Sequence, residues 1–466
     1  MRPLSVVLLV SLSDTIAAIA TPIGEGGLAV IRVSGTQAMT VADKCFRPGG
    51  KSSCLPSAAP THTIQYGHAF RGERVIDEVL VSVMRAPRTF TREDVVEITC
   101  HGGLLASKGV LDAVLASGAR LAEPGEFTKR AFLSGRLDLA QAEAVADLIH
   151  ARTDLALSAA NEQLAGKLSQ KINELRDGLV ATLAHVEAHL DFPDEDISPD
   201  TLEKLLKRMT DAVEFIDRLL RTADEGQILR RGVRAAIIGR PNAGKSSLLN
   251  HLLGHERAIV SPIPGTTRDT IEETANIRGL PVVFIDTAGL REGGDELEAE
   301  GIRRSHASLQ KAELILHVID GSEPLDPADS RYLSELSDKQ RIVVLNKSDQ
   351  PRRADVPSDL APDAVVLSCQ TGDGVEALKD AIKARLWSGS ATAESLQVMI
   401  NSRHQDALRR GRESLERTVA ALREGVSLDF AAFDLRMAVN AIGEVVGKTT
   451  TEDILDSIFS QFCLGK

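Results

Sequence analysis

Short apolar runs rich in β-branched residues alternate with turn residues from residue 14 to about residue 125. The runs cover residues 29–33, 79–83 and 95–98, with Gly, Pro and Asp residues between them. Runs of this length between turn residues are typical of strands. The pattern therefore predicts a small α+β domain over residues 14–125.

A helical period begins after Leu137. This spacing of three or four positions predicts one face of a single long helix that packs against other helices. A turn at residues 191–194 ends that helix and residues 202–220 resume the period, so residues 126–225 are expected to be all-α. The periodic apolar residues are Leu164, Leu168, Ile172, Leu175, Leu179, Leu183, Val186 and Leu190.

Apolar runs alternate with helical segments between residues 226 and 385. Such continuous runs with crossover helices predict a parallel, doubly wound α/β sheet. Helical periodicity returns over residues 386–466, so we expect the α/β domain to be inserted into the all-α helical domain. The runs cover residues 233–238, 282–285, 314–319, 342–345 and 364–367.

The composition is that of a globular protein, with 26% charged and 43% hydrophobic residues. The formal net charge of -12 repels nucleic acid phosphates, so any RNA contact needs a local basic patch such as residues 230–234 or 403–412. The 5 cysteines fit neither a disulfide framework nor a zinc site, which favours a cytoplasmic location.

Residues 1–13 contain a short apolar run after Arg2, an arrangement found in signal peptides. Asp14 interrupts the pattern, so we interpret residues 1–13 as an extension from a start codon placed too far upstream. No other stretch approaches the roughly 20 apolar residues of a membrane span, and no stable membrane insertion is expected.

Residues 239–246 (GRPNAGKS) have the spacing of a phosphate-binding loop and directly follow an apolar run. Such loops bring backbone amides to the phosphates, while Lys245 contacts the β and γ oxygens and Ser246 binds Mg²⁺. Residues 286–289 (DTAG) follow the next run and supply a carboxylate for Mg²⁺ and a backbone contact for the γ-phosphate. These motifs predict a nucleoside triphosphate site.

Two shorter motifs select the base. In residues 346–349 (NKSD), the carboxylate of Asp349 can pair with two guanine donors that adenine lacks, and residues 368–370 (SCQ) would support the base through their backbone. GTP is therefore the predicted nucleotide. Leu290 stands where Ras-like proteins carry the glutamine that positions water, so another group must orient the water and stabilise the developing charge.

With residues 264–269 (PGTTRD) and 286–292 (DTAGLRE), the chain resembles the MnmE (TrmE) family of tRNA modification GTPases from residue 14 to residue 466. The most specific motifs lie elsewhere, at residues 14–22, 100–103, 124–128, 137–144 and 462–466.

The resemblance implies a multidomain fold. Residues 14–125 would be an α+β N-terminal domain that binds folate and dimerises, and residues 226–385 an inserted α/β P-loop G domain with a Ras-like doubly wound sheet. Residues 126–225 and 386–466, with the Cys-Leu-Gly-Lys tail, would form the all-α helical domain.

The resemblance also implies that a potassium ion replaces an arginine finger. Glu298 would orient the attacking water, with Lys245 and Thr267 completing the catalytic set, although from the sequence alone Glu298 is one of several solvated acids. The implied Mg²⁺ ligands are Ser246 and Thr267, and the implied K⁺ ligands are Asn242, Ser261, Ile263 and Thr266. The implied GTP contacts come from Asn242, Ala243, Gly244, Lys245, Ser246, Ser247, Ser261, Pro262, Ile263, Pro264, Gly265, Thr266, Thr267, Asp286, Thr287, Ala288, Gly289, Asn346, Lys347, Asp349, Ser368, Cys369 and Gln370.

A tetrahydrofolate derivative, 5,10-methylene- or 5-formyl-tetrahydrofolate, would bind to Arg32, Glu97, Arg136 and Lys466. Arginine and lysine pair with the carboxylates of a folate tail, and a glutamate accepts hydrogen bonds from the pterin amino group. Taken singly, without the resemblance, each of these residues is better explained as a surface charge.

The implied function is a GTPase that modifies position 5 of the wobble uridine of certain tRNAs, adding a carboxymethylaminomethyl or aminomethyl group with a folate one-carbon unit. The implied partners are a second copy of the chain, tRNA and an FAD-dependent MnmG (GidA) type protein in a heterotetramer, so FAD enters only through the partner. The alternative is a regulatory or ribosome-assembly GTPase without modification activity, which has no use for the N-terminal domain and the C-terminal tail.

Overall fold

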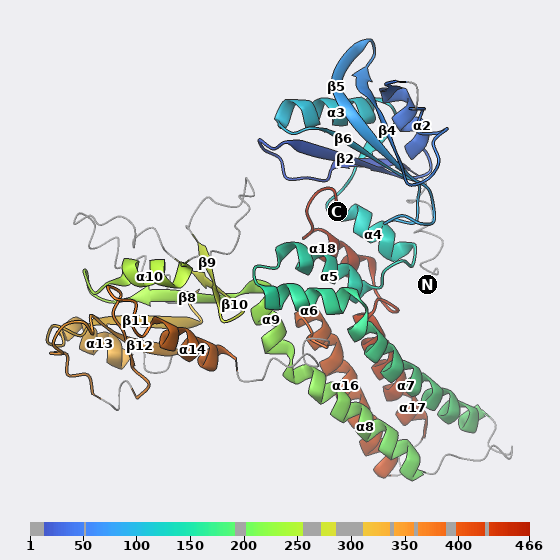
Figure 1. Ribbon diagram of the computed structural model, residues 1–466. Coiled ribbons are helices and arrows are strands. Elements are labelled where there is room, and N and C mark those ends of the chain that lie inside the picture. Colours follow the sequence, from blue (N-terminus) through green and yellow to red (C-terminus); the bar gives the residue numbers. More distant parts are fainter. Residues whose placement is uncertain are drawn as a thin grey trace. The chain divides into compact units, whose positions relative to one another are not determined.

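The computed structural model describes residues 14–50, 53–191, 202–254, 272–285, 311–335, 340–357, 362–387, 398–424 and 428–466. They belong to two compact units. Figure 1 shows the helices and strands, coloured by their position in the sequence. The first unit comprises residues up to 146, 172–180 and 439–466, and the second comprises residues 147–171 and 181–438. No helix in these ranges is long and apolar enough to span a membrane.

A seven-stranded sheet with the order β3-β4-β5-β6-β2-β1-β7 forms the centre of the first unit. Neighbouring strands are antiparallel except β1 and β7, which are parallel. The strands are β1 (Ile16–Ile19), β2 (Leu28–Ser34), β3 (Phe46–Pro48), β4 (Thr63–Arg71), β5 (Arg74–Met84), β6 (Val95–His101) and β7 (Arg120–Leu121).

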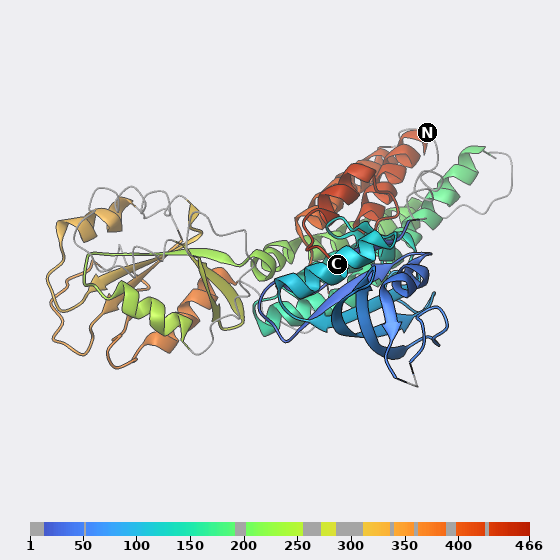
Figure 2. The same cartoon turned by 90° about the horizontal axis from the view of Figure 1, so that it is seen from above.

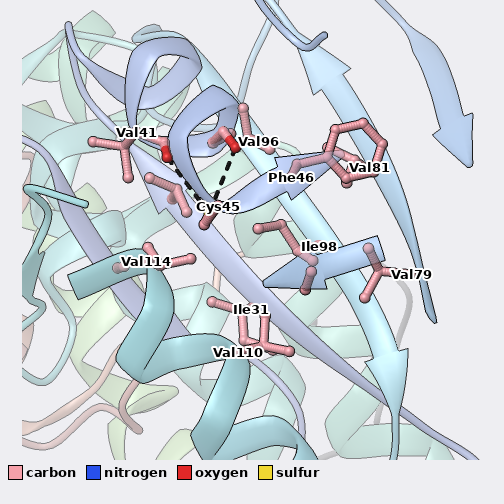
Figure 3. Close-up of a cluster of buried hydrophobic side chains, with 14 of the residues drawn as sticks. Ile31, Val41, Cys45, Phe46, Val79, Val81, Val96, Ile98, Val110 and Val114 are labelled. Carbon is pink, nitrogen blue, oxygen red and sulfur yellow. Dashed lines mark hydrogen bonds between the residues drawn. The ribbon is translucent and has the colours of Figure 1, made fainter. Parts of the chain in front are cut away.

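Helices α2 (Ala38–Cys45) and α3 (Leu104–Ala116) cover one face of this sheet. Val41 of α2 and Val110 of α3 belong to one buried cluster with Ile31 and Ile98 of the sheet, and Figure 3 shows these four side chains among others of the cluster. Because alternate strand residues point to the same face, every second residue of β2 contributes to this core. The predicted α+β character of the N-terminal domain is confirmed.

Helix α4 (Glu126–Leu133) carries a buried arginine, Arg130, whose side chain is 2% exposed. Arg130 forms ion pairs with Asp14 at 2.6 Å, Glu126 at 2.9 Å and Glu93 at 3.0 Å. Burial alone would raise the pKa of Glu126, but hydrogen bonds from Arg120 and Arg130 hold it below its ordinary value. The motifs at residues 14–22 and 124–128 therefore meet in one ion-pair network around the buried Arg130.

Two more helices lie mainly in the first unit, α5 (Leu139–His150) and α18 (Glu452–Phe459). The C-terminal tail returns to α4, where Phe127 N donates to the Lys466 carbonyl oxygen at 3.2 Å.

The long helices lie largely in the second unit, where Val186, Leu205 and Leu422 share a core. One predicted boundary is wrong: Leu164 ends a separate helix, because Gly166 takes a φ of 84° that an α-helix does not accommodate. These helices are α6 (Asp154–Leu164), α7 (Lys167–Asp191), α8 (Leu202–Arg221), α9 (Ala223–Arg231), α16 (Ser402–Arg423) and α17 (Leu428–Val445).

The second unit also holds a six-stranded sheet with the order β13-β12-β11-β8-β10-β9. All neighbours are parallel except β9 and β10. The strands are β8 (Val233–Ile238), β9 (Glu273–Ile277), β10 (Leu280–Phe284), β11 (Leu314–Asp320), β12 (Arg341–Asn346) and β13 (Val365–Val366).

Helices α10 (Lys245–Leu253) and α14 (Val375–Leu386) pack on one face of this sheet, and Figure 2 shows them on the same side in light green and orange. Helix α13 (Pro327–Glu335) packs on the other face through Leu333. Helices on both faces of a mainly parallel sheet confirm the predicted doubly wound α/β domain.

Candidate functional site

The phosphate-binding loop leads from β8 into α10. Gly239 has a φ of 143°, and a Cβ there would lie 2.1 Å from the Val318 carbonyl oxygen, so only glycine fits. At Gly244, with a φ of 99°, a Cβ would lie 2.0 Å from Asn346 Nδ2. The two glycines let the loop pack against β11 and against the predicted base-binding motif. Helix α10 begins directly after the loop, and a helix N-terminus favours anions.

Lys245 is held by the backbone of its own loop. Nζ donates to the carbonyl oxygens of Gly239 at 2.9 Å and Arg240 at 2.7 Å. Burial lowers the pKa of Lys245, and the charge of Asp329 offsets part of this effect. A partly desolvated ammonium is most stable beside an anion, which fits the predicted contact with phosphate.

The predicted base-binding motifs lie beside this loop. Asn346 is buried, its Nδ2 donates to the Ala243 carbonyl oxygen at 2.8 Å, and its Oδ1 accepts from Cys369 N at 3.0 Å. Ser368 Oγ donates to Asp349 Oδ1 at 2.5 Å. The structure therefore brings together the predicted residues of three segments, residues 242–247, 346–349 and 368–370.

Two further residues support these motifs and escaped the sequence analysis. Asp320 accepts from Lys347 Nζ at 2.5 Å and from the Ser322 hydroxyl at 2.6 Å. Burial alone would raise the pKa of Asp320, but these bonds hold it below its ordinary value. Asp320 ends a parallel strand, and ligands bind at the carboxyl ends of such strands, so the sequence contained a signal for this residue. His251, whose Nε2 lies 2.6 Å from the Cys369 carbonyl oxygen, carries no such signal.

The other predicted nucleotide and metal residues lie outside the described residues. They are Ser261, Pro262, Ile263, Pro264, Gly265, Thr266, Thr267, Asp286, Thr287, Ala288, Gly289 and Glu298. Their roles stay predictions.

Three of the four residues predicted to bind folate, Arg32, Glu97 and Lys466, form a cationic cluster in the first unit. Arg32 Nε donates to Glu97 Oε1 at 2.8 Å, and Arg32 Nη1 donates to the Gly465 carbonyl oxygen at 3.2 Å. Burial lowers the pKa of Lys466, and the charge of Arg32 lowers it further. The side chains of this cluster are two cations and one carboxylate, so the cations can pair with carboxylates of an anionic ligand.

Arg136, the fourth predicted residue, packs over an aromatic ring, as Arg32 does. Its guanidinium lies 5.1 Å from the ring centre of Phe90, and Nη1 donates to a backbone carbonyl oxygen at 2.6 Å. The Arg32 guanidinium lies 5.7 Å from the ring centre of Phe127. Phe127 is fully buried, and the partly buried Phe90 packs against the apolar cluster that contains it.

Known proteins resemble this chain along nearly its whole length. Residues 15–136 match the family model of the GTP-binding protein TrmE N-terminus, and residues 139–463 match that of the MnmE helical domain. The tRNA modification GTPase MnmE of Geobacillus kaustophilus is 49% identical over 461 residues, which cover 97% of this chain and 99% of the relative. The chain belongs to the MnmE family.

Other MnmE proteins give the same result. The tRNA modification GTPases MnmE of Chloroflexus aurantiacus and Bacillus subtilis are 47% and 45% identical, cover 98% and 97% of this chain, and each align over 100% of the relative. Membership of the MnmE family, together with the doubly wound domain and its phosphate loop, confirms the predicted enzyme class, a GTP hydrolase of the tRNA modification GTPases.

Proposed function

We propose that this chain is a potassium-activated GTPase that modifies position 5 of the wobble uridine of certain tRNAs together with an FAD-dependent MnmG (GidA) type partner. It acts as a homodimer within a heterotetramer and takes the one-carbon unit from a tetrahydrofolate derivative. The single observation that carries the proposal is the cationic cluster. A regulatory or ribosome-assembly GTPase, the alternative, has no use for it.

On the nucleotide side, Lys245 stabilises negative charge on the β and γ phosphates, and Ser246, in the first turn of α10, supplies a hydroxyl ligand for Mg²⁺. Asn242 supplies an amide oxygen to K⁺, which contributes the positive charge that an arginine finger contributes in other GTPases. Thr267, Asp286 and Glu298 complete the set from outside the described residues.

On the folate side, the side chains fit an anionic ligand that also carries hydrogen-bond donors. Arg32, Arg136 and Lys466 pair with carboxylates of the tail, and Glu97 accepts hydrogen bonds from amino groups of the pterin. The free state of all 5 cysteines, with none in a disulfide, supports a cytoplasmic location, where tRNA and folate are present.

Calorimetric titration of the full chain with 5-formyl-tetrahydrofolate tests the proposal. We expect binding by the native chain and roughly 10-fold or greater weakening in Arg32→Gln, because charge-assisted hydrogen bonds to the tail are lost. Arg47→Gln is the control, since Arg47 also stacks on an aromatic ring, 4.2 Å from the centre of Phe70, in the same unit. A native chain that binds no folate would leave the regulatory GTPase as the better description.

A further inference from the structure

His251 joins the helix that follows the phosphate loop to the loop of residues 368–370. It lies in the last turn of α10, and its Nε2 is 2.6 Å from the carbonyl oxygen of Cys369, 118 residues further along the chain. A carbonyl oxygen can only accept, so Nε2 carries the proton and donates it. Among the contacts described above, only His251 binds the Cys369 carbonyl oxygen.

The peptide unit between Cys369 and Gln370 is bound at both ends. Its carbonyl oxygen accepts from His251, and its amide, Gln370 N, donates to Ser368 Oγ at 3.1 Å. Because a peptide unit is planar, two bonds in opposite directions determine its orientation. The orientation of this unit therefore depends on α10 as well as on the loop itself.

Ser368 passes this constraint to Asp349. Its Oγ accepts from Gln370 N and from Thr371 N, at 3.2 Å, which directs the hydroxyl proton to Asp349 Oδ1 at 2.5 Å. A continuous chain of hydrogen bonds runs from His251 through the Cys369–Gln370 peptide and Ser368 to Asp349. Cys369 N is held separately by Asn346 Oδ1 at 3.0 Å.

We propose that His251 is a positioning residue for guanine recognition, which orients the carboxylate of Asp349 through the Cys369–Gln370 peptide and Ser368. The inference rests on the proposed role of Asp349 as the group that pairs with guanine. In a phosphate-loop GTPase, such a bridge makes the phosphate-binding helix and the base-binding loop one rigid unit. Loss of the bridge then affects base selection and nucleotide retention but leaves the chemistry at the γ-phosphate unchanged.

The test compares GTP with ITP, whose base lacks the 2-amino group and so loses one of the two hydrogen bonds to Asp349. In His251→Ala we expect the ratio of kcat/KM for GTP over ITP to fall roughly 3- to 10-fold, the value of about one hydrogen bond, and GDP to dissociate faster by a similar factor. The kcat for GTP stays within about twofold, since no group at the γ-phosphate is altered.

Two variants separate positioning from a loss of packing. His251→Gln keeps a side-chain N–H donor and should restore most of the GTP preference, whereas Asn250→Ala, at an exposed neighbour on the same helix, should change neither ratio nor dissociation rate. A folded His251→Ala protein with the native GTP over ITP ratio, or His251→Gln no better than His251→Ala, would overturn the inference.

Asp349→Asn distinguishes failure of this inference from failure of the proposed base site. If Asp349→Asn abolishes the preference for GTP over ITP and His251→Ala does not alter it, only the role of His251 is refuted. If Asp349→Asn leaves the preference intact, Asp349 does not read the base, and the proposed guanine site and the role of His251 both fail.

Discussion

Arg240 occupies a variable position of the phosphate loop, yet its guanidinium faces three carboxylates. They belong to Glu323 at 2.5 Å, Asp326 at 3.3 Å and Asp329 at 3.8 Å. Asp329 is buried, with 4% of its side chain exposed, and lies 3.7 Å from the imidazole of His317. Without Arg240, the negative charge of these three carboxylates would lie close to a loop that is predicted to bind a polyphosphate.

We therefore expect Arg240→Gln to raise the KM for GTP about 3- to 10-fold with little change in kcat, because carboxylates that have lost the charge of Arg240 repel the triphosphate. The increase should be larger at low salt, where the repulsion is less screened. Arg231→Gln is the control, since Arg231 pairs with Glu313 at 2.5 Å on an exposed surface away from the loop. Steady-state kinetics at two ionic strengths measure the effect, and a KM equal to that of the control would contradict it.

The sequence motifs point to candidate ligand-binding residues but not to the residues that hold them in place. Lys245, Asn346 and Asp349 lie in patterns whose spacing and chemistry are dictated by phosphate and guanine, so the patterns are recognisable without a structure. Arg240 and His251 act on groups that are distant in sequence, and only the fold brings these groups near. A pattern read along the chain contains no signal for such contacts.

At the scale of elements, apolar periodicity predicted the buried strands well and the helix boundaries less well. Strand β8 has the predicted bounds because it is apolar except for Arg234, whose side chain is exposed. Strand β9 was not predicted, because its sequence ETANI has only isolated apolar residues and it pairs with one neighbour at the edge of the sheet. The division between α6 and α7 was missed, because the apolar spacing continues across Gly166 although the backbone does not.

The division between α6 and α7 predicts opposite effects on stability for two glycine-to-alanine substitutions. Gly166→Ala should lower the free energy of unfolding by about 1 kcal/mol, because alanine is strained at a φ of 84°. Gly178→Ala should raise it by up to about 1 kcal/mol, because Gly178 lies inside α7 with no atom near its Cβ position and alanine favours the helix. Urea unfolding monitored by circular dichroism checks both, and a stabilising Gly166→Ala would mean that the division is not required.

At the scale of the whole molecule, the net charge of -12 leaves few surfaces that could attract RNA. The two basic segments singled out from the sequence are largely paired with acids: Arg230 with Asp147, Arg231 with Glu313, and Arg412 with Asp217. Neither segment is therefore a strong electrostatic site by itself. This favours a tRNA surface completed by the proposed partner protein.

The proposed potassium dependence belongs to the same scale, because potassium is expected to bring the G domains of two copies together across the nucleotide. GTP hydrolysis by the full chain should be strongly faster in KCl than in NaCl at equal ionic strength, and the advantage should grow with protein concentration. Asn242→Gly should reduce the KCl rate roughly 10-fold or more toward the NaCl rate, because an oxygen ligand is lost while the φ of 59° remains accessible to glycine.

The control is Arg278→Gly, a substitution at an equivalent backbone angle, φ 54°, on an exposed turn of the same sheet. It relaxes the backbone in the same way but removes no ligand, so its ratio of KCl to NaCl rates should match that of the native chain. Equal native rates in both salts would mean that hydrolysis depends on another source of positive charge. The most direct candidate is then the partner protein, because a side chain supplied in trans can take the place of the ion.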